Sequence, residues 1–309
     1  MSSFSRSALK VPILSRLWTM YPKAWKYVVN IGLFIKYKTL NIQKLPSKIK
    51  LPSSFTIHIN PTENRGRALL IKNGITQQQL GTFWRESVSS FMPSIVLDIG
   101  VNYGECLFSV QYPEHTKIFG IEANHHLMKY VIKSLSEHPN RSQMRIIHAF
   151  ASNENQQEQE FYIDKNWSGT SGGKPIYSDR IEKDTVQTIT IDSLLNDIDV
   201  TQQKVLFKID VEGYEAFVLE GMKNMIEMCK ELLGIIEFDS KYIKQTGVHI
   251  DEFIYYLSTT FELFIYDKRG TLQPMTETMC KELQKIVQTK DVHLDIVLHK
   301  RNERKNREW

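Results

Sequence analysis

The chain has 309 residues, of which 41% are hydrophobic and 24% charged, which is ordinary for a folded globular protein. This length accommodates one large α/β domain with a sizeable core and an N-terminal extension. The three cysteines (Cys106, Cys229 and Cys280) are far apart and include no C-x-x-C pair. A disulfide framework and a cysteine zinc site are therefore excluded, and a reducing, cytoplasmic compartment is expected.

The net charge of +4 conceals an uneven distribution. Residues 1–50 contain ten Lys or Arg and no Asp or Glu, whereas all 35 acidic residues lie in 51–309. The basic segment also carries aromatic residues and an apolar stretch over 27–35, which is far short of the ~20 residues needed to cross a bilayer. It has no small-residue cleavage site after a clean apolar core, so we do not expect a secretory signal.

Three interpretations of this basic segment remain open. Residues 1–50 could contact the anionic inner face of a membrane, because basic and aromatic side chains are mixed there. Alternatively, the segment is a helix docked on its own domain with a solvated basic face. Its Ser-rich start without acidic residues is also typical of an organelle transit peptide.

Apolar runs alternate with helix-like stretches from residue 95 onward. A strand is expected within 53–60, and a helix over 75–92 with Thr76 as its N-cap and Pro93 after its end. The later expected strands are 95–99, 117–122, 144–149, 160–163, 205–209, 232–237, 262–266 and 293–299. The expected helices between them are 105–111, 127–136, 191–198, 213–229 and 250–257. This alternation predicts βαβ units and a mainly parallel sheet. We expect an extension over 1–60, a catalytic domain over 61–300 and a charged tail over 301–309.

The first motif, Asp98-Ile-Gly-Val-Asn-Tyr-Gly104, closes one apolar strand. Its two glycines can adopt backbone angles closed to other residues and let the chain approach a ligand closely. A carboxylate beside such a loop disfavours phosphate, and neither G-x-G-x-x-G nor G-K-[ST] is present. Glu122 ends the next strand, where a carboxylate typically accepts hydrogen bonds from ribose hydroxyls. The motif thus predicts a nucleoside with a positive centre; the alternative is that Asp98 and Glu122 only cap helices.

The second motif, Lys208-Ile-Asp-Val-Glu-Gly213, closes another apolar strand about a hundred residues later. Carboxyl ends of parallel strands meet at one crevice, so this motif should lie beside the first. Two carboxylates near a lysine can separate their pKa values, and one of them can deprotonate an alcohol. Divalent-metal binding and simple helix capping are the alternatives. Glu237, at the end of the next strand, is expected to bind substrate or to tune Asp210.

Several blocks in order resemble the FkbM family of S-adenosylmethionine-dependent methyltransferases. They are Val96–Gly104, Ile121–Asn124, Ala149–Asn153, Glu160–Ile163, Thr188–Leu195, Phe207–Glu215 and Val218–Gly221. Two departures occur: Ala123 stands where the family usually has proline, and Asn153 where an aspartate is common. The resemblance spans about residues 66–300, and its most specific block is Lys-Ile-Asp-Val-Glu-Gly.

The resemblance implies a Rossmann-like class I methyltransferase fold. This fold has a seven-stranded, mostly parallel sheet with an antiparallel last strand and helices on both faces. Its cofactor is S-adenosyl-L-methionine, with Glu122 at the ribose and Ser152 near the adenine. The methionine part would be lined by Asp98, Gly100, Asn102 and Gly104.

The expected reaction is O-methylation of a hydroxyl on a sugar, a glycan precursor or a secondary metabolite. We assign Asp210 as base or orienting group, Glu212 as its partner and Lys208 as the residue that tunes their charge. No resident metal and no nucleic-acid partner are expected. A nucleotide-dependent oxidoreductase and a non-catalytic, membrane-associated binding module are the rival interpretations.

Overall fold

The central sheet of the computed structural model explains most of the sequence pattern. The structure describes residues 22–39, 41–175, 180–267 and 270–301. The sheet has eight strands in the order β12-β11-β13-β10-β9-β3-β4-β5. Their bounds are β3 Ile95–Ile99, β4 Lys117–Glu122, β5 Met144–His148, β9 Lys204–Ile209, β10 Glu231–Asp239, β11 Glu262–Tyr266, β12 Leu272–Pro274 and β13 His293–Arg301.

The strand order is that of a class I methyltransferase fold, as predicted. Strands β3, β4, β5, β9 and β10 are parallel, while β13 inserts antiparallel between β10 and β11. One detail differs from the prediction, because β12 pairs antiparallel with β11 and adds an eighth strand at the edge. Its three residues are all exposed, so it shows no buried apolar pattern that would reveal it in the sequence.

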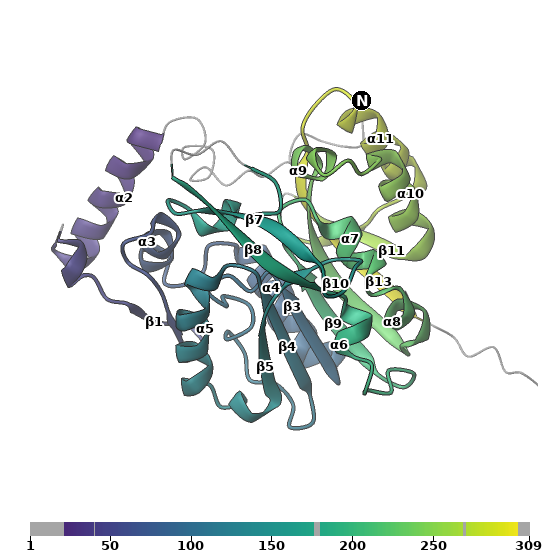
Figure 1. Cartoon of the computed structure of the whole chain (residues 1–309), viewed down its shortest axis with the longest axis horizontal. Coiled ribbons are helices and arrows are strands. Elements are labelled where there is room, and N and C mark those ends of the chain that lie inside the picture. Colours follow the sequence, from purple (N-terminus) through teal and green to yellow (C-terminus); the bar gives the residue numbers. More distant parts are fainter. Residues whose placement is uncertain (1–21, 40, 176–179, 268–269, 302–309) are drawn as a thin grey trace, which may run out of the picture.

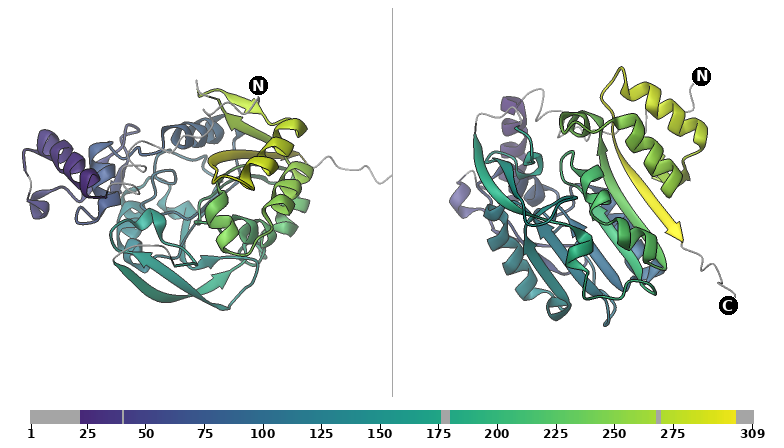
Figure 2. Two further views of the ribbon diagram at one scale, coloured as in Figure 1. Left: turned by 90° about the horizontal axis from the view of Figure 1, so that it is seen from above. Right: turned by 45° about the vertical axis from the view of Figure 1, so that its right-hand side comes forward.

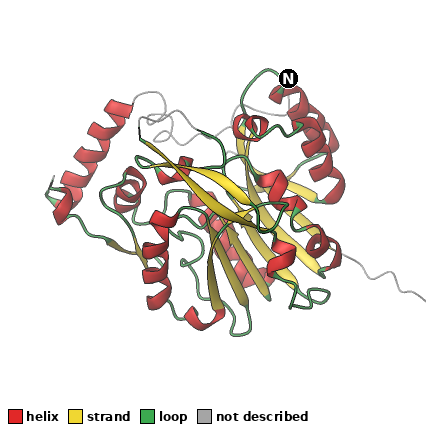
Figure 3. Ribbon diagram, viewed as in Figure 1, coloured by secondary structure: helices red, strands yellow, loops and turns green. Residues whose placement is uncertain are grey.

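Helices cover both faces of the sheet, as Figures 1 and 3 show. Along β9, Phe207 and Ile209 pack into one core and Leu206 into the other, because successive strand residues point to opposite faces. The first core is formed mainly by the helices α6 Ile191–Leu194, α7 Glu215–Glu220, α8 Lys223–Met228, α10 Ile250–Thr260 and α11 Glu277–Val287, and the short helix α9 contributes Ile243 to it. The helices of the second core are α2 Pro22–Tyr37, α3 Asn64–Ile71, α4 Gln78–Phe91 and α5 His125–Glu137.

Smaller elements complete the fold. A strand pair, β1 Lys48–Lys50 and β2 Thr56–His58, packs on α5, where the His58 N–H donates to Ser134 at 2.8 Å. The hairpin of β7 and β8 crosses in front of the main sheet (Figure 1). The remaining elements are β6 Phe150–Ala151, β7 Glu158–Asp164, β8 Ile181–Ile189, α9 Ser240–Gln245 and three 3₁₀ turns at Ile42–Lys44, Arg141–Gln143 and Ser168–Thr170.

Three local predictions were wrong. Residues 105–111 form turns instead of a helix, and Cys106 to Val110 are all buried, so the segment has no amphipathic pattern that would favour one structure over the other. The helix expected over 213–229 is split into α7 and α8 at Gly221, where the Ser152 carbonyl approaches so closely that a Cβ would lie 2.1 Å from it. Thr76 is not an N-cap, because its N–H and hydroxyl bond to Glu105.

The expected extension over 1–60 is continuous with the second core from α2 onward. Val29 and Leu33 of α2 are buried there, together with Ile57 of β2. Residues 1–21 and 302–309, including most of the expected tail, lie outside the described residues. Among the described residues, no helix is both long enough and apolar enough to cross a membrane.

The packing of β9 against β10 yields a test of the fold. Gly234 lies directly opposite Phe207, and a Cβ on Gly234 would come within 2.1 Å of the Phe207 ring. We expect Gly234→Ala to lower the free energy of unfolding by about 1–3 kcal/mol through overpacking. In a Phe207→Leu background the same change should cost less, as measured by urea denaturation.

The matched control is Gly81→Ala in helix α4. There the new Cβ meets only the tip of the Arg85 side chain, so the change should be neutral or stabilise by about 0.5–1 kcal/mol. Equal costs for Gly234→Ala in the two backgrounds would contradict the proposed contact.

Candidate active site

A cavity of about 780 Å³ opens at the carboxyl ends of β3, β4, β9 and β10. Its volume lies within the usual range for small-molecule sites. Eight of the ten residues predicted from the sequence line it: Asp98, Gly100, Asn102, Glu122, Lys208, Asp210, Glu212 and Glu237. The two motifs, about a hundred residues apart in the sequence, thus meet as predicted. Gly104 and Ser152 do not line this cavity.

Lys208 joins the two motifs. Its ammonium lies 3.2 Å from Asp98 Oδ1, 2.7 Å from the Gly100 carbonyl oxygen and 3.6 Å from Asp210 Oδ2. Both Asp98 and Lys208 are buried. Burial raises the pKa of Asp98, which the Lys208 charge partly offsets. Burial would lower the pKa of Lys208, but the charges of Asp98 and Asp210 together raise it, so the ammonium stays charged.

The glycine loop has its shape for steric reasons. Gly100 has a φ of +81°, and a Cβ there would lie 1.9 Å from the Asp210 carbonyl oxygen. Only glycine permits this approach of the first motif to the second. Gly104 has a φ of +82° and faces the Phe108 ring, so it shapes the loop from behind rather than lining the cavity.

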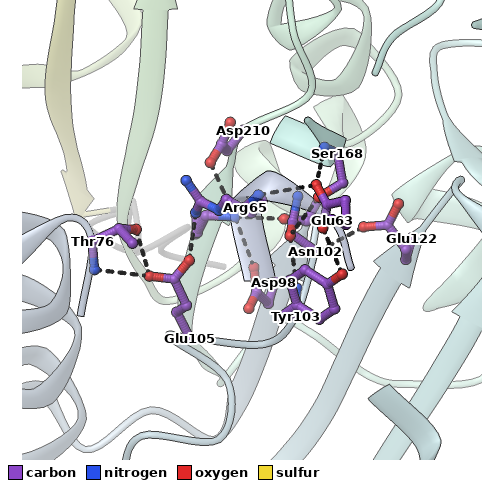
Figure 4. A network of polar contacts seen from close by, with 12 residues as sticks. Glu63, Arg65, Thr76, Asp98, Asn102, Tyr103, Glu105, Glu122, Ser168 and Asp210 are labelled. Carbon is purple, nitrogen blue, oxygen red and sulfur yellow. Dashed lines mark hydrogen bonds and ion pairs between the residues drawn. The ribbon is translucent and has the colours of Figure 1, made fainter. Parts of the chain in front are cut away.

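Glu122 is held by two backbone groups. Its Oε2 accepts from the Asn102 N–H and its Oε1 from the Asn124 N–H, both at 2.7 Å (Figure 4 shows Asn102 and Glu122). A carboxylate can accept about four hydrogen bonds, so each oxygen retains acceptor capacity toward the cavity. Burial raises the pKa of Glu122 to about 7, against the lowering effect of these two N–H donors.

The other end of the cavity is acidic. Oxygen atoms of Asp210, Glu212 and Glu237 all lie within 4.8 Å of one another. Burial, followed by the neighbouring carboxylates, raises the pKa of Glu212 and of Glu237 well above 4.5. Protons on these two groups let the three carboxyls share one site and make two of them hydrogen-bond donors. The same three oxygens have the chemistry of a divalent-cation site, which keeps the metal alternative open.

His293 supplies a cation at this acidic end. Its ring nitrogens lie 3.5 Å from Glu237 Oε1 and 3.1 Å from Asp239 Oδ2. Burial would lower the pKa of His293, but these carboxylates raise it to about 10. The sequence offered a signal that was missed, because His293 and Asp295 place charge in an otherwise buried strand.

Arg65 and Glu63 are the other residues that the motifs did not reveal. Arg65, on α3, lines the cavity, forms an ion pair with Glu105 and lies over the Trp167 ring. Glu63 accepts from the Tyr103 hydroxyl and the Ser168 N–H, both at 2.6 Å, and so fastens the 168–171 turn above the glycine loop (Figure 4). No motif surrounds either residue, and only the tertiary packing of α3 brings them here.

Ser152, the residue expected near the adenine, lies beside the cavity lining and not in it. Its hydroxyl lies 3.2 Å from Asn153 Oδ1, and its neighbours Ala149, Phe150 and Ala151 line the cavity instead. The Ser152 carbonyl packs closely against Gly221, which keeps the Ser152 backbone behind the residues that line the cavity. His125 and His126 also lie outside the lining, on α5, where they face Glu182 and Asp184 of β8.

Comparison with known families now identifies the domain. The sequence model of the methyltransferase FkbM domain matches residues 98–266, which is more than half of the chain. The chain belongs to the FkbM methyltransferase family. The match begins at Asp98 and contains both motifs that line the cavity. None of the curated proteins compared with this sequence matches it.

Solved structures similar to this FkbM chain are distant from it in sequence. The FkbM methyltransferase of Methylobacillus flagellatus is 13% identical, with a TM-score of 0.39; the match covers 67% of this chain and 44% of that one. The O-methyltransferase TomG of Streptomyces achromogenes, in complex with SAM, is 7% identical over 78% and 87% of the two chains, with a TM-score of 0.41. A Bacillus cereus O-methyltransferase in complex with SAH is 8% identical over 74% and 83%, with a TM-score of 0.39. This chain thus spans less than half the length of the Methylobacillus protein.

The buried ion pair gives the second prediction. Lys208→Met leaves the Asp98 carboxylate buried without its cation, so we expect unfolding to become easier by about 3–5 kcal/mol. The double variant Asp98→Asn/Lys208→Met should recover part of this loss, because no uncompensated charge remains. Urea denaturation of the three proteins measures the coupling.

Lys204→Met is the matched control on the same strand. Lys204 lies 3.2 Å from Glu231, but it is partly exposed, so its loss should cost no more than about 1 kcal/mol. A Lys208→Met protein as stable as Lys204→Met would show that the buried pair contributes nothing.

Proposed function

We propose that this FkbM domain binds S-adenosyl-L-methionine and transfers its methyl group to a hydroxyl oxygen. One observation supports the proposal: a guanidinium, a carboxylate beside the glycine loop and a carboxylate held by backbone N–H groups line the same cavity. These groups belong to Arg65, Asp98 and Glu122.

The donor set fits this cofactor. An α-amino group can donate to Asp98, an α-carboxylate can accept from Arg65, and two ribose hydroxyls can donate to Glu122. A nicotinamide dinucleotide would instead require a loop that cradles a pyrophosphate, whereas Asp98 places a carboxylate beside this loop. The family assignment and the strand order support the same choice.

Bound S-adenosyl-L-methionine would supply a methyl group on a sulfonium centre, to which the acceptor oxygen bonds as the carbon–sulfur bond breaks and S-adenosylhomocysteine leaves. The chain's own task is to hold that oxygen in line and to remove its proton. Asp210 lies at the cavity between Lys208 and the acidic end, so we assign it to accept the proton. Positioning can supply about 7–11 kcal/mol, and a general base a further factor of about 10²–10⁴ in rate.

The acidic end supports a polyhydroxylated acceptor such as a sugar, a glycan precursor or a secondary metabolite. Glu212 and Glu237, with raised pKa values, can donate to acceptor oxygens, while Asp210 accepts from a hydroxyl. A phosphorylated or carboxylated group next to the reacting oxygen would meet four carboxyl groups here, including Asp239, and the His293 cation is already paired with two of them. We therefore propose neutral hydroxyls as the groups bound at this end.

Calorimetric titration of the full chain with S-adenosylmethionine, S-adenosylhomocysteine and NAD tests the cofactor. We expect micromolar binding of the first two and none of NAD. Glu122→Ala should weaken binding of both by about 1–3 kcal/mol, because hydrogen-bonding groups lose their partner. A folded protein that binds none of the three, or a Glu122→Ala variant of unchanged affinity, would overturn the assignment.

The pH dependence of that affinity provides a sharper control. Ribose hydroxyls donate to the charged form of Glu122, whose pKa in the free protein is about 7. Affinity should therefore rise as the pH rises through 7 and become constant above it. In Glu122→Gln, which has no proton to lose, this rise should disappear.

A further prediction concerns turnover. Asp210→Asn keeps the size of the side chain but cannot accept the proton of the acceptor hydroxyl, so we expect turnover to fall about 10²–10⁴-fold. The affinity for S-adenosylhomocysteine should change little, because the Asp210 side chain forms its ion pair with Lys208, and its backbone contact with Gly100 is kept in Asn. Single-turnover methyl transfer to a hydroxylated acceptor, once one is found by screening, measures the step. Undiminished turnover would remove Asp210 from the mechanism.

A further inference from the structure

Helix α2 presents an apolar face to solvent. Five large hydrophobic side chains on it are 47–72% exposed: Tyr27, Val28, Ile31, Phe34 and Ile35. They are half of all the strongly exposed large hydrophobic residues in the described part of the chain. Figure 2 shows α2 at the periphery, remote from the sheet. A cluster of this kind on a folded protein usually marks an interaction surface.

The opposite face of α2 fixes the helix to the protein. Val29 and Leu33 are buried, and the Tyr37 hydroxyl donates to the Leu70 carbonyl of α3 at 3.3 Å. At about 100° per residue, the exposed apolar positions centre on the side directly opposite Val29 and Leu33. The exposed face is therefore held outward by packing of the inner face.

The charge around α2 indicates what this face contacts. Residues 1–62 contain no acidic residue, and ten of the chain's Lys and Arg lie within 1–50. Among them Lys38 and Lys44, just beyond the helix, are exposed. The chain segment around α2 thus combines exposed aromatic and aliphatic residues with Lys and Arg and has no acidic residue of its own, a composition complementary to lipid headgroups of negative charge.

We propose that α2 docks on an anionic lipid surface, with its axis in the plane of the membrane. The helix has 16 residues, or about 24 Å, which is too short to span a bilayer but suits the headgroup boundary. Tyr27, Val28, Ile31, Phe34 and Ile35 would enter the apolar layer, while neighbouring lysines contact the headgroups. A second copy of the chain would cover the apolar face but would leave the one-sided charge without a partner.

Vesicle flotation of the full chain tests this proposal. We expect the protein to float with phosphatidylcholine vesicles that contain roughly one third phosphatidylserine, and to float far less with phosphatidylcholine alone. The triple variant Ile31→Ser/Phe34→Ser/Ile35→Ser should lose at least about tenfold in partitioning. Salt at about 1 M should weaken the wild-type association, because the Debye length falls to about 3 Å.

A matched triple variant separates this face from general surface hydrophobicity. Ile132→Ser/Met228→Ser/Tyr255→Ser removes three exposed apolar side chains from other helices, and it should float like the wild type. Failure of the wild type to float, or equal loss in both triple variants, would overturn the proposal. So would a wild-type dimer in solution that the α2 variant converts to a monomer, since a second copy would then cover the face.

Discussion

The buried contact of Lys208 with Asp98 is the constraint on which the site depends. One ammonium neutralises a fully buried carboxylate and donates to the Gly100 carbonyl oxygen at 2.7 Å. Asp98 lies near the end of β3, and Lys208 lies opposite it on β9. The pair therefore fixes the register of two adjacent strands close to the point where the loops that follow them separate. The approach of Gly100 to the Asp210 carbonyl then fixes the second motif against the first. The two ends of the cavity are thus positioned by one junction.

The two ends of the cavity use carboxyl groups differently. Glu122 is held by backbone N–H groups, and its pKa of about 7 reflects burial opposed mainly by these donors, with smaller effects from the charges of Lys208 and Asp98. Glu212 and Glu237 lie close to Asp210, so repulsion among like charges adds to burial. The arrangement around Glu122 suits a ligand whose hydroxyl groups donate hydrogen bonds to this carboxylate. The second retains protons and can orient an acceptor while Asp210 accepts from it.

The sequence predicted the sheet well because buried parallel strands are short apolar runs with a repeating spacing. All the expected strands of the main sheet were found, and Asp98, Glu122, Lys208 and Asp210 met because strand ends meet by geometry. Arg65 and Glu63 could not be found in this way, since they reach the site through the packing of α3. The helix predicted over residues 105–111 was wrong for a related reason. A segment that is buried on all sides has no alternation of apolar and polar residues from which its structure could be predicted.

Helix α3 links the exposed face of α2 to the cavity. Its residues Arg65 and Ala68 line the cavity, while Ile71, one turn further, packs beside Gly32 of α2. Lys36 of α2 also bonds to the Leu70 carbonyl and to Asn73, at the end of α3. A lipid surface against α2 would therefore lie one helix away from the residue proposed to hold the cofactor carboxylate. Side-chain and backbone contacts, and not a linker, hold α2 and α3 together. If α2 docks as proposed, its packing on α3 therefore sets the height and the tilt of the cavity above the headgroups.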